Sequence, residues 1–532
     1  MKRSSPISGV NCFRLKTRVD DDFFELGGHS LLAATLVARL GAAFDREISL
    51  RDFLDEPTIA AVAAKLARAT DDENGNRLPA ILPMSLRGEL PLSLAQEQFF
   101  KLDELISGAA FLHLPYAYRL SGRLDLAALR QSLQSIVDRH AVLRSLFKES
   151  HGRCVQVIRS SRKAACPLRD LSALAAERQR MALAKLSRQD ADRPFDLAKG
   201  PPFRFTLIRL SERRHVLFVT LHHIIADQSS LRLFRAELAR CYQAFARGRP
   251  VRLSHLPIQF ADFTRWQATL LESGKLNGQI EYWQEALAGA PPALKFHQGK
   301  KRPRTVSART SRRTMELDNT LLAKVRALAR RRKTTPFIIL LAALDLWLYR
   351  STGCRDLRIG TLVANRGRRG TEGLIGYLVN AVVLRARMAP RMTFTELIEQ
   401  ARTAALGAFA HQDLPIEALA RARQQKKARR QSSLYQVMLN YRRFDFKTQT
   451  DAGLTIASYS ENERAANPEI AFTSADLTFD MREASTKLTV SVNFKADLFD
   501  EAALNSMLAS FAAVVEQAVA LPERRLASFV VR

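Results

Sequence analysis

The stretch His215–Asp227, HVLFVTLHHIIAD, is the part of the sequence that decides the fold. Its first seven residues form a nearly continuous apolar run, which predicts a buried strand over His215–Leu221. A second apolar run, Phe203–Leu210, precedes it, and a helical pattern, Ser230–Phe245, follows it. Strands that alternate with helices indicate a layered α/β architecture.

The same alternation continues along most of the chain. The further predicted elements are helices over Leu126–Val142, Thr334–Tyr349 and Glu501–Leu521, and strands over Leu357–Val363 and Leu488–Phe494. The longest apolar run, Phe337–Tyr349, is too short to span a bilayer and contains Asp345. We therefore expect a buried helix there.

The first part of the chain is different in pattern. Residues Asp20–Thr70 are compact and helical, and Asp71–Leu90, rich in Pro, Gly and Asn, is typical of a linker. Two apolar stripes at helical spacing are predicted before the linker: Leu32, Leu36 and Leu40, and then, in a helix that begins at Pro57, Ile59, Val62 and Leu66.

Ser30 is the first residue with a candidate chemical role. It follows Gly27 and Gly28, which allow a tight loop, and it lies at or near the start of a predicted helix. Free backbone N–H groups and the helix dipole favour a phosphate at such a place, so a serine carrying a phosphodiester is favoured. A plain helix-capping serine is the alternative that this local pattern leaves open.

The adjacent pair His222 and His223 is the second candidate. Neighbouring side chains of an extended chain point to opposite sides, so one histidine can face a channel while the other packs inward. A neutral imidazole suits proton transfer near pH 7, and Asp227 is placed to orient the loop. Adjacent histidines on a strand chelate a metal poorly and no third ligand is apparent, so no metal site is predicted. Two buried structural histidines remain the alternative.

The string DDFFELGGHSLLA, residues 21–33, closely resembles the pantetheine-attachment motif of peptidyl carrier domains. Ile48–Ala67, ISLRDFLDEPTIAAVAAKLA, resembles the rest of such a domain. This resemblance implies that Ser30 carries covalent 4′-phosphopantetheine, whose thiol holds an acyl chain as a thioester. Only 20 residues precede Asp21, where the family has a long first helix, so the carrier is expected to be truncated.

The string HHIIADQSS, 222–230, resembles the HHxxxDG motif of condensation domains, which belong to the chloramphenicol-acetyltransferase-like superfamily. Further segments resemble the family's other motifs in order: LSLAQEQFF at 92–100, RHAVLRSLF at 139–147, QFADFTRWQ at 259–267, IGYLVNAVVLR at 375–385, HQDLPIEAL at 411–419 and, more loosely, SLYQVMLNY at 433–441. Taken singly, each of these segments is explained by core packing by default; taken together, they cover the chain from about Ile81 to its end.

The resemblance carries roles to individual residues. His223 is implied as the catalytic residue, either as a general base or as a group that positions the attacking amine, while His222 and Asp227 are implied as structural. In the family the motif acid pairs with an arginine of the other lobe, and Arg366 fits that position. This sequence departs from the pattern at Gln228, where the family has Gly, at Ser229, and at Ala141, where the family usually has Glu.

The implied architecture is a small all-α carrier followed by a two-lobed α/β condensation domain, each lobe chloramphenicol-acetyltransferase-like. The expected divisions are 1–70 for the carrier, 71–90 for the linker, 91–260 for the first lobe and 261–532 for the second. The implied function is amide bond formation in nonribosomal peptide synthesis, between a donor thioester held at Ser30 and an acceptor amine. An adenylation domain and a downstream carrier are expected to act in trans, with a phosphopantetheinyl transferase as a further partner.

Four rival functions share some of these features. An epimerisation domain shares HHxxxDG but carries EGHGRE and GWFT-type strings that are missing here, and a heterocyclisation domain replaces the histidine pair. A non-catalytic platform that docks carriers through a basic face stays open because of Gln228 and the short carrier. An ester-forming or chain-releasing condensation domain would use the same histidine, so nothing in the sequence separates it.

The composition sets the remaining expectations. The formal net charge is +29, but the basic residues are spread out and no nucleic-acid signature accompanies them, so no nucleic-acid partner is expected. The N-terminus has no apolar segment of a secretory signal, and no membrane partner is expected. Five widely spaced cysteines without a CxxC pair favour a reducing, cytoplasmic compartment. They are Cys12, Cys154, Cys166, Cys241 and Cys354.

Overall fold

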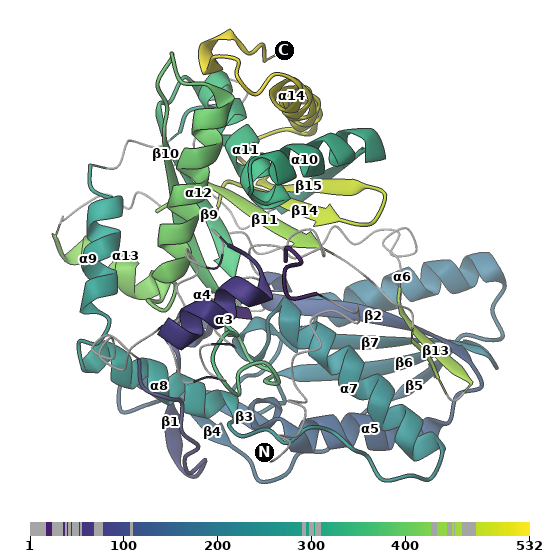
Figure 1. Cartoon of the computed structure of the whole chain (residues 1–532). Helices are drawn as coiled ribbons and strands as arrows, with labels where there is room; N and C mark the ends of the chain where they lie inside the picture. Colours follow the sequence, from purple (N-terminus) through teal and green to yellow (C-terminus); the bar gives the residue numbers. More distant parts are fainter. Residues whose placement is uncertain are drawn as a thin grey trace.

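The computed structural model contains two large mixed sheets, each covered by helices, and one small third sheet (Figure 1). The residues that it describes are 18–23, 36–37, 40, 44, 53, 56–68, 78–106, 110–289, 294–296, 300, 303, 310–426, 434–443, 449–451, 453–459 and 475–531.

The first large sheet has the strand order β12-β13-β2-β7-β6-β5. Its strands are β2 (His113–Gly122), β5 (Leu168–Asp170), β6 (Phe203–Ser211), β7 (Arg214–His222), β12 (Gln449–Asp451) and β13 (Leu454–Ser458). In β7, Leu217 and Val219 belong to the main core, while Val216 and Phe218 pack in a second cluster with Leu183. This alternation buries both faces, since successive strand side chains point to opposite sides.

Helices cover the two faces of this sheet. The helices α5 (Leu126–Arg139) and α7 (Gln228–Ala246) pack together on one face, and α6 (Ala176–Asp192) contacts β2 and β7 on the other (Figure 1). Phe234 of α7 lies within 5.6 Å of Phe205 of β6, measured between ring centroids. Helix α7 begins at Gln228, directly after the end of β7 and the turn that carry His222 and His223.

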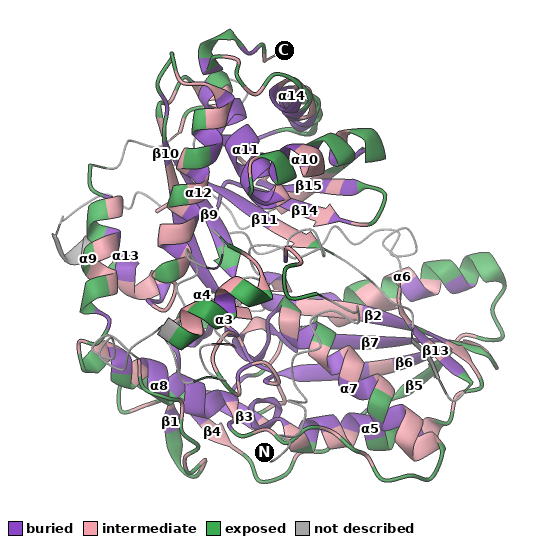
Figure 2. Ribbon diagram, in the orientation of Figure 1, coloured by how far each residue is buried: buried purple, intermediate pink, exposed green. Residues whose placement is uncertain are grey.

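The second large sheet has the order β10-β9-β11-β14-β15-β8. Its strands are β8 (Thr310–Leu317), β9 (Asp356–Val363), β10 (Asn380–Arg387), β11 (Val437–Arg443), β14 (Leu477–Glu483) and β15 (Leu488–Lys495). The helices that pack with it are α10 (Asn319–Arg331), α11 (Pro336–Thr352), α12 (Phe394–Ala410) and α14 (Glu501–Ala520). Every residue of α11 from Phe337 to Tyr349 is buried, Asp345 included (Figure 2).

The two large sheets are linked by a crossing segment. Strand β13 pairs with β2 of the first sheet, although it lies between β11 and β14 of the second sheet in the sequence. The small third sheet, β1 (Glu89–Pro91), β4 (Arg153–Ile158) and β3 (Ser145–Ser150), contacts α8 (Phe260–Glu272). The remaining helices are α4 (Leu94–Leu105), α9 (Asn277–Ala286) and α13 (Ile416–Lys426).

The described residues before 69 are helical or irregular, with α3 (Ile59–Arg68) as the longest helix. Phe23, Val37, Phe53 and Val62 form their core, and the rings of Phe23 and Phe53 meet edge to face at 5.2 Å. Of the three residues predicted to share one face of this helix, Val62 is in the core and Leu66 packs against it, but Ile59 is 53 % exposed. It is the first residue of α3 and lies beyond the edge of this small core.

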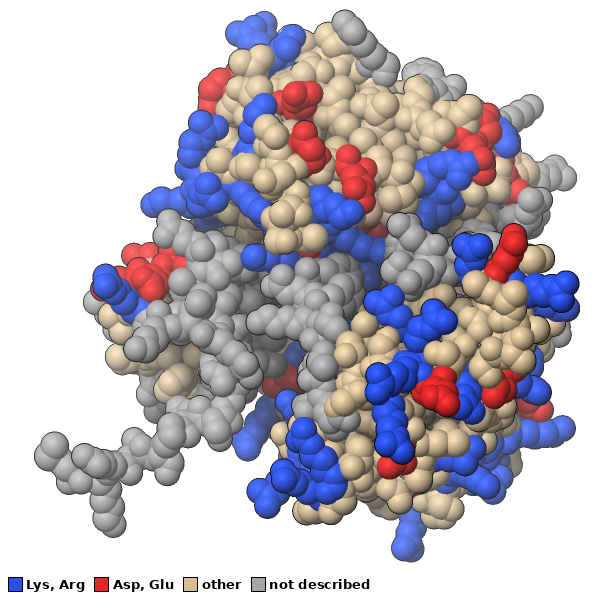
Figure 3. Space-filling model, turned by 90° about the vertical axis from the view of Figure 1, so that its right-hand side faces the viewer, with Lys and Arg blue, Asp and Glu red and all other residues tan. Residues whose placement is uncertain are grey.

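Where the structure describes them, the predicted helices and strands agree with it to within about three residues at each end, whereas most of the helix predicted around Leu32, Leu36 and Leu40 lies outside the described residues. The buried helix expected over Phe337–Tyr349 is confirmed as α11. One described helix, α14, is long and apolar enough to cross a membrane by length and composition alone, but half of the relevant window is buried inside the protein. Lysine and arginine side chains are scattered over both lobes on the face seen in Figure 3, with acidic residues between them.

Candidate active site

The paired histidines lie where β7 ends. His222 is the last residue of β7, and His223 opens a single 3-10 turn, His223–Ile225, that leads into α7. Asp227 is the N-cap residue of α7, and its side chain accepts a hydrogen bond from the backbone N–H of Ser230 at 2.8 Å. A buried strand and a capped helix therefore fix the short loop from both ends.

His223 lies against two aromatic rings from distant parts of the chain. Its ring centroid is 5.8 Å from that of Phe99 in α4 and 6.0 Å from that of Tyr377, and those two rings meet edge to face at 4.8 Å. The side chain is only partly exposed, and its buried Nδ1 atom has no hydrogen-bond partner among the described residues. Burial, and then the neighbouring His222, lower the pKa of His223 to about 4, so the imidazole is neutral at pH 7.

His222 points the other way and is fully buried. Its Nδ1 accepts a hydrogen bond from the backbone N–H of Ile224 at 3.0 Å, and its Nε2 lies 3.6 Å from a carboxylate oxygen of Asp103. His113 is its cross-strand partner in β2, and the two ring centroids are 5.9 Å apart. Burial lowers the pKa of His222, which therefore acts as a neutral packing residue that fixes the end of β7.

Asp227 and Arg366 form a buried ion pair between the two large sheets. Arg366 Nη2 is 3.0 Å from Asp227 Oδ1 and 3.1 Å from Oδ2, and the two side chains are 9 % and 2 % exposed. Arg366 Nη1 donates to the backbone carbonyls of Thr371 and Leu374, at 3.1 and 2.6 Å. The guanidinium thus organises its own loop while it holds α7, the arrangement that makes a buried charge pair tolerable.

Ser230 and Gly376 complete this junction. Ser230 Oγ donates to the carbonyl of Gly376 at 3.0 Å, and Arg366 Nη2 reaches the same carbonyl at 3.3 Å. A Cβ atom at Gly376 would lie 2.2 Å from the ring of Phe260, so only glycine fits there. The loop that follows β9 therefore delivers Arg366, Gly376 and Tyr377 together to the start of α7.

A second contact ties this loop to the segments at 259–267 and 411–419. Arg368 forms an ion pair with Asp413 at 2.8 Å and places its guanidinium 4.7 Å above the ring of Trp266. His411 stacks on Tyr282 at 3.7 Å and does not approach His223. Phe263 and Trp266 are core residues, and Asn380, the first residue of β10, uses its side-chain amide to hold the carbonyls of Gln412 and Leu414.

Two departures from the family pattern are accommodated. Gln228 is the first residue of α7, is exposed and has an ordinary helical backbone, so no glycine is needed there. Ala141 is buried, and its backbone N–H donates to Gln259 Oε1 at 3.0 Å. Sequence reasoning missed the roles of Phe99 and Tyr377 beside His223; their position inside two motif segments was the available signal.

Ser30, the predicted attachment residue, lies outside the described residues. Among the residues that the structure describes, no group of three or more His, Cys, Asp or Glu side chains is arranged to hold a metal ion.

Two of the motif segments, those with Phe99 and Tyr377, thus meet at His223 of a third, and Arg366 ties that segment to the second sheet. The chain belongs to the condensation domain family: the model of that family matches residues 86–531. A second model, the phosphopantetheine attachment site, matches residues 12–66. The chain thus joins a carrier region, which takes covalent 4′-phosphopantetheine, to a condensation domain of the kind found in nonribosomal peptide synthetases, with the two-lobed chloramphenicol-acetyltransferase-like fold.

Known proteins similar to the chain agree with this. It is 37 % identical over 501 residues, 94 % of its length, to one of the linear gramicidin synthase proteins of Brevibacillus parabrevis, of which it covers 10 %. It is 35 % identical over 96 % of its length to the nonribosomal peptide synthetase kk1B of Curvularia clavata, of which it covers 4 %. The chain therefore spans a tenth or less of the length of these relatives.

Among solved structures, the X-domain from teicoplanin biosynthesis superposes with a TM-score of 0.75 at 26 % identity. That comparison covers 85 % of this chain and all of the X-domain. The starter condensation domain of rhizomide synthetase RzmA, solved with C8-CoA, superposes with a TM-score of 0.70 at 20 % identity over 84 % of this chain and 98 % of that one. The second likeness shows the fold alone.

Proposed function

We propose that the chain forms amide bonds between a donor acyl or peptidyl thioester and an acceptor amine, and that His223 is the catalytic residue. The observation that carries this proposal is the position of His223: a neutral, partly exposed imidazole between Phe99 and Tyr377. Its loop is held by the buried pair of Asp227 and Arg366. Membership of the condensation domain family supports the same reaction class.

The donor is assigned to a 4′-phosphopantetheine arm attached at Ser30, which supplies the thiol that holds the acyl group. The nitrogen of the acceptor amine attacks the thioester carbonyl, the C–N bond forms and the C–S bond breaks. The thiol leaves with the proton that the amine gives up, so atoms and charge balance without a further reactant. Phe99 and Tyr377 keep water away from this place.

The pKa of His223 favours one of the two roles considered for it. A histidine with a pKa of about 4 stays neutral at pH 7, so it can accept a hydrogen bond from the amine. It is a weak base, however, because its surroundings solvate the imidazolium poorly, so full proton transfer to it is unfavourable. We assign His223 mainly to orienting the amine and stabilising the positive charge that develops on its nitrogen.

The acceptor, and the adenylation domain that activates each substrate, are assigned to other parts of a synthetase, acting in trans. A solved four-domain nonribosomal peptide synthetase is similar in fold to this chain over 84 % of its length. A phosphopantetheinyl transferase is assigned as the enzyme that modifies Ser30.

The test begins with co-expression of the chain and a broad-specificity phosphopantetheinyl transferase, followed by intact mass. Wild type should gain one phosphopantetheine and Ser30→Ala none. The loaded chain is then given an acyl donor and a carrier-bound amine, and the product is identified by mass. His223→Ala should lose about 10²- to 10⁴-fold in rate, whereas His255→Ala, which removes an exposed histidine, should match wild type.

Each other outcome points to a rival function. Loading without amide formation, together with tight carrier binding, would favour a docking platform. An ester, or a free acid released from the carrier, would favour the ester-forming or chain-releasing reaction. Equal rates for His223→Ala and wild type would refute the role of His223.

A further inference from the structure

One side of helix α4 lies against the turn that carries His223. Three residues of α4 make these contacts: Gln96, Phe99 and Asp103. Their spacing, i, i+3 and i+7, places them on the same face of the helix. They meet three consecutive residues, His222–Ile224, one each. Of the three, only Phe99 has been given a part in the reaction above.

Gln96 binds the backbone of this turn. Its side-chain Nε2 donates to the carbonyl of Ile224 at 2.9 Å, and its Oε1 accepts a hydrogen bond from the backbone N–H of Ser93 at 3.1 Å. The first partner can only accept and the second can only donate, so the two bonds together fix which end of the amide faces the turn. Gln96 is fully buried, and a backbone carbonyl in such a place needs a donor.

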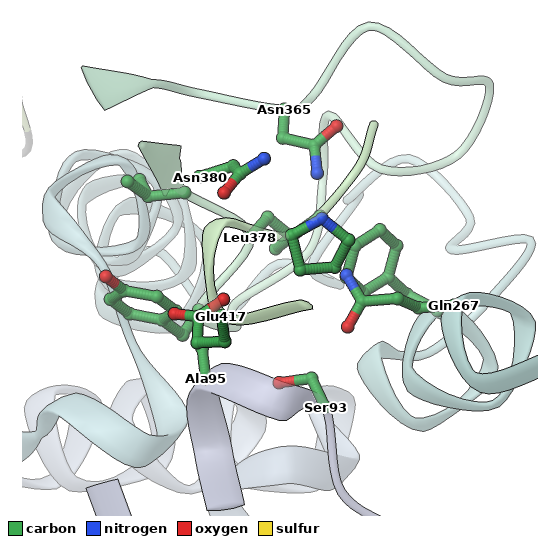
Figure 4. Close-up of a pocket in the computed structure, with 11 residues that line it drawn as sticks. Ser93, Ala95, Gln267, Asn365, Leu378, Asn380 and Glu417 are labelled. Carbon is green, nitrogen blue, oxygen red and sulfur yellow. The ribbon is translucent and has the colours of Figure 1, made fainter. Parts of the chain in front are cut away.

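The start of α4 is itself held in place. The Ser93 side chain accepts from the backbone N–H of Gln96 at 3.2 Å, which completes a capping box. Figure 4 shows Ser93 and Ala95 at the edge of a small pocket that Tyr377 also lines. The amide of Gln96 therefore projects from a capped helix end that adjoins the site of His223.

His222 holds the other side of the same turn. Its Nδ1 accepts from the N–H of Ile224 at 3.0 Å, so in the neutral ring the proton is on Nε2, which lies 3.6 Å from Asp103 Oδ1. The N–H of Ile224 belongs to the peptide group that directly follows His223, and the carbonyl of Ile224 belongs to the next one. Both peptide groups after His223 are thus bound by side chains.

The direction of the His223 side chain depends on this backbone. A histidine is commonly oriented by a hydrogen bond to its second ring nitrogen. The buried Nδ1 of His223 makes no well-formed hydrogen bond within the described part of the chain, and its ring packs on Phe99 and Tyr377. Ring contacts are less directional than hydrogen bonds, so the backbone of the turn has to set the direction of the imidazole.

We propose that Gln96 is a positioning residue for His223: by holding the carbonyl of Ile224, its amide sets the direction in which the imidazole meets the attacking amine. Displacement of a reacting group by about 1 Å can cost about 10²-fold in rate, so a hydrogen bond that fixes the turn bears directly on catalysis. Gln96 acts on the amine only through His223. The inference rests on the proposed function, because it assigns a role within the same reaction.

The test compares two glutamines that differ in place and not in chemistry. Gln96→Met removes the amide and keeps a side chain of similar length and volume. Gln179→Met is the matched control, because Gln179 of α6 is also buried and its Nε2 donates to the carbonyls of Leu171 and Leu210 at 3.1 and 2.8 Å. Each variant leaves backbone carbonyls without their donor, so both should melt below wild type.

Two readouts separate positioning from stability. The first is kcat, together with the KM for the carrier-bound amine, in the amide-forming assay. The second is NMR of the chain labelled with ¹³C at histidine Cε1, in which His223→Ala identifies the signal of His223 among the ten histidines. Gln96→Met should lower kcat about 10- to 100-fold with the KM unchanged, and should move the His223 signal. Gln179→Met should keep the kcat and the His223 signal of wild type.

If Gln96→Met melts below the assay temperature, Gln96→Glu takes its place, since a carboxylate still accepts from Ser93 but has no proton to donate to Ile224. The same fall in kcat and the same movement of the His223 signal are then expected. A folded Gln96 variant with wild-type kcat and an unmoved His223 signal would overturn the inference, as would equal losses of kcat in Gln96→Met and Gln179→Met.

The two proposals fail in different ways. If wild type forms no amide, the proposed function is overturned, and the NMR comparison still shows whether Gln96 sets the direction of His223. If His223→Ala loses its rate while Gln96→Met keeps it, the proposed function stands and this inference is overturned.

Discussion

Replacing Asp227 by asparagine separates the two tasks of that residue. Asp227 caps α7 through the Ser230 N–H and neutralises Arg366 across the junction of the two sheets. Asparagine caps a helix about as well as aspartate, so Asp227→Asn keeps the cap and removes the charge. Arg366, only 9 % exposed, then stays buried without an anion, which costs about 3–5 kcal/mol of folding stability. Asp227→Ala also loses the cap, at about 1 kcal/mol more.

Arg366→Ala should cost less than Asp227→Asn, for a structural reason. Without the arginine, the carboxylate of Asp227 still accepts bonds from the backbone N–H groups of Ser230 and Leu378, and the Ser230 hydroxyl, whose one proton lies within reach of both Asp227 and Gly376, can turn to it. We therefore expect a loss near 3 kcal/mol, about the lower end of the range for a broken buried pair. The double variant should lose less than the sum of its two single variants, because the partners are in direct contact.

The assay is urea unfolding followed by tryptophan fluorescence. All three tryptophans lie between residues 266 and 347, and Trp266 is in contact with Arg368 from the loop that carries Arg366. Asp318→Asn is the matched control, because Asp318 caps α10 in the same way but is exposed. It should change stability by less than about 0.5 kcal/mol. If Asp227→Asn is as stable and as active as wild type, the assignment of this pair as the junction that orders the site is refuted.

Three further predictions concern buried groups. Burial raises the pKa of Asp345 in α11 well above its usual value, so the folded state holds a proton that the unfolded state releases. Asp345→Asn should therefore be more stable than wild type, by an amount that grows as pH rises above about 4. Thermal melts of both proteins at several pH values would show this difference. Burial lowers the pKa values of His113 and His223 to about 4. The free energy of unfolding should therefore fall as pH drops from about 6.5 toward 4, because the unfolded state takes up protons first. In urea unfolding at several pH values, His113→Asn should show a smaller fall than wild type. Gly376→Ala should reduce both stability and amide formation, because the new methyl group collides with Phe260; wild-type melting and rates in this variant would contradict the tight packing seen there.

The local parts of the fold could be predicted from the sequence, because each rests on a short periodic pattern. Such patterns predict strands β7 and β15 and helices α11 and α14 to within about three residues at each end. The direction of each histidine follows from the alternation of an extended chain, since His222 is buried while His223 keeps some exposure. Predictions of this kind use only neighbouring residues in the sequence and do not require knowledge of which distant segments are in contact.

The parts that could not be predicted depend on contacts between distant segments. Nothing in the five residues Leu454–Ser458 indicates that they return to pair with β2 of the first sheet. The meeting of Phe99, His223 and Tyr377 is also invisible in the sequence, because each aromatic taken alone is explained by core packing. The exposure of Ile59 has a related cause: helical periodicity gives the face of a helix but not where the core that covers it ends.

The two departures from the family pattern at Ala141 and Gln228 show that a residue missing from a motif in the sequence can be replaced by one that is close in space, or need not be replaced. Glutamate is usual where Ala141 stands, next to Arg139 and His140, yet both of these residues contact a carboxylate: Glu237 of α7, at 3.1 and 2.8 Å. The carboxylate beside Arg139 and His140 therefore comes from Glu237 of α7 and not from residue 141. Gln228 likewise needs no positive φ, because it opens α7 with its side chain exposed. The junction at Asp227 and Arg366 forms in spite of both substitutions, so neither one disrupts the ion pair that holds the loop of His223.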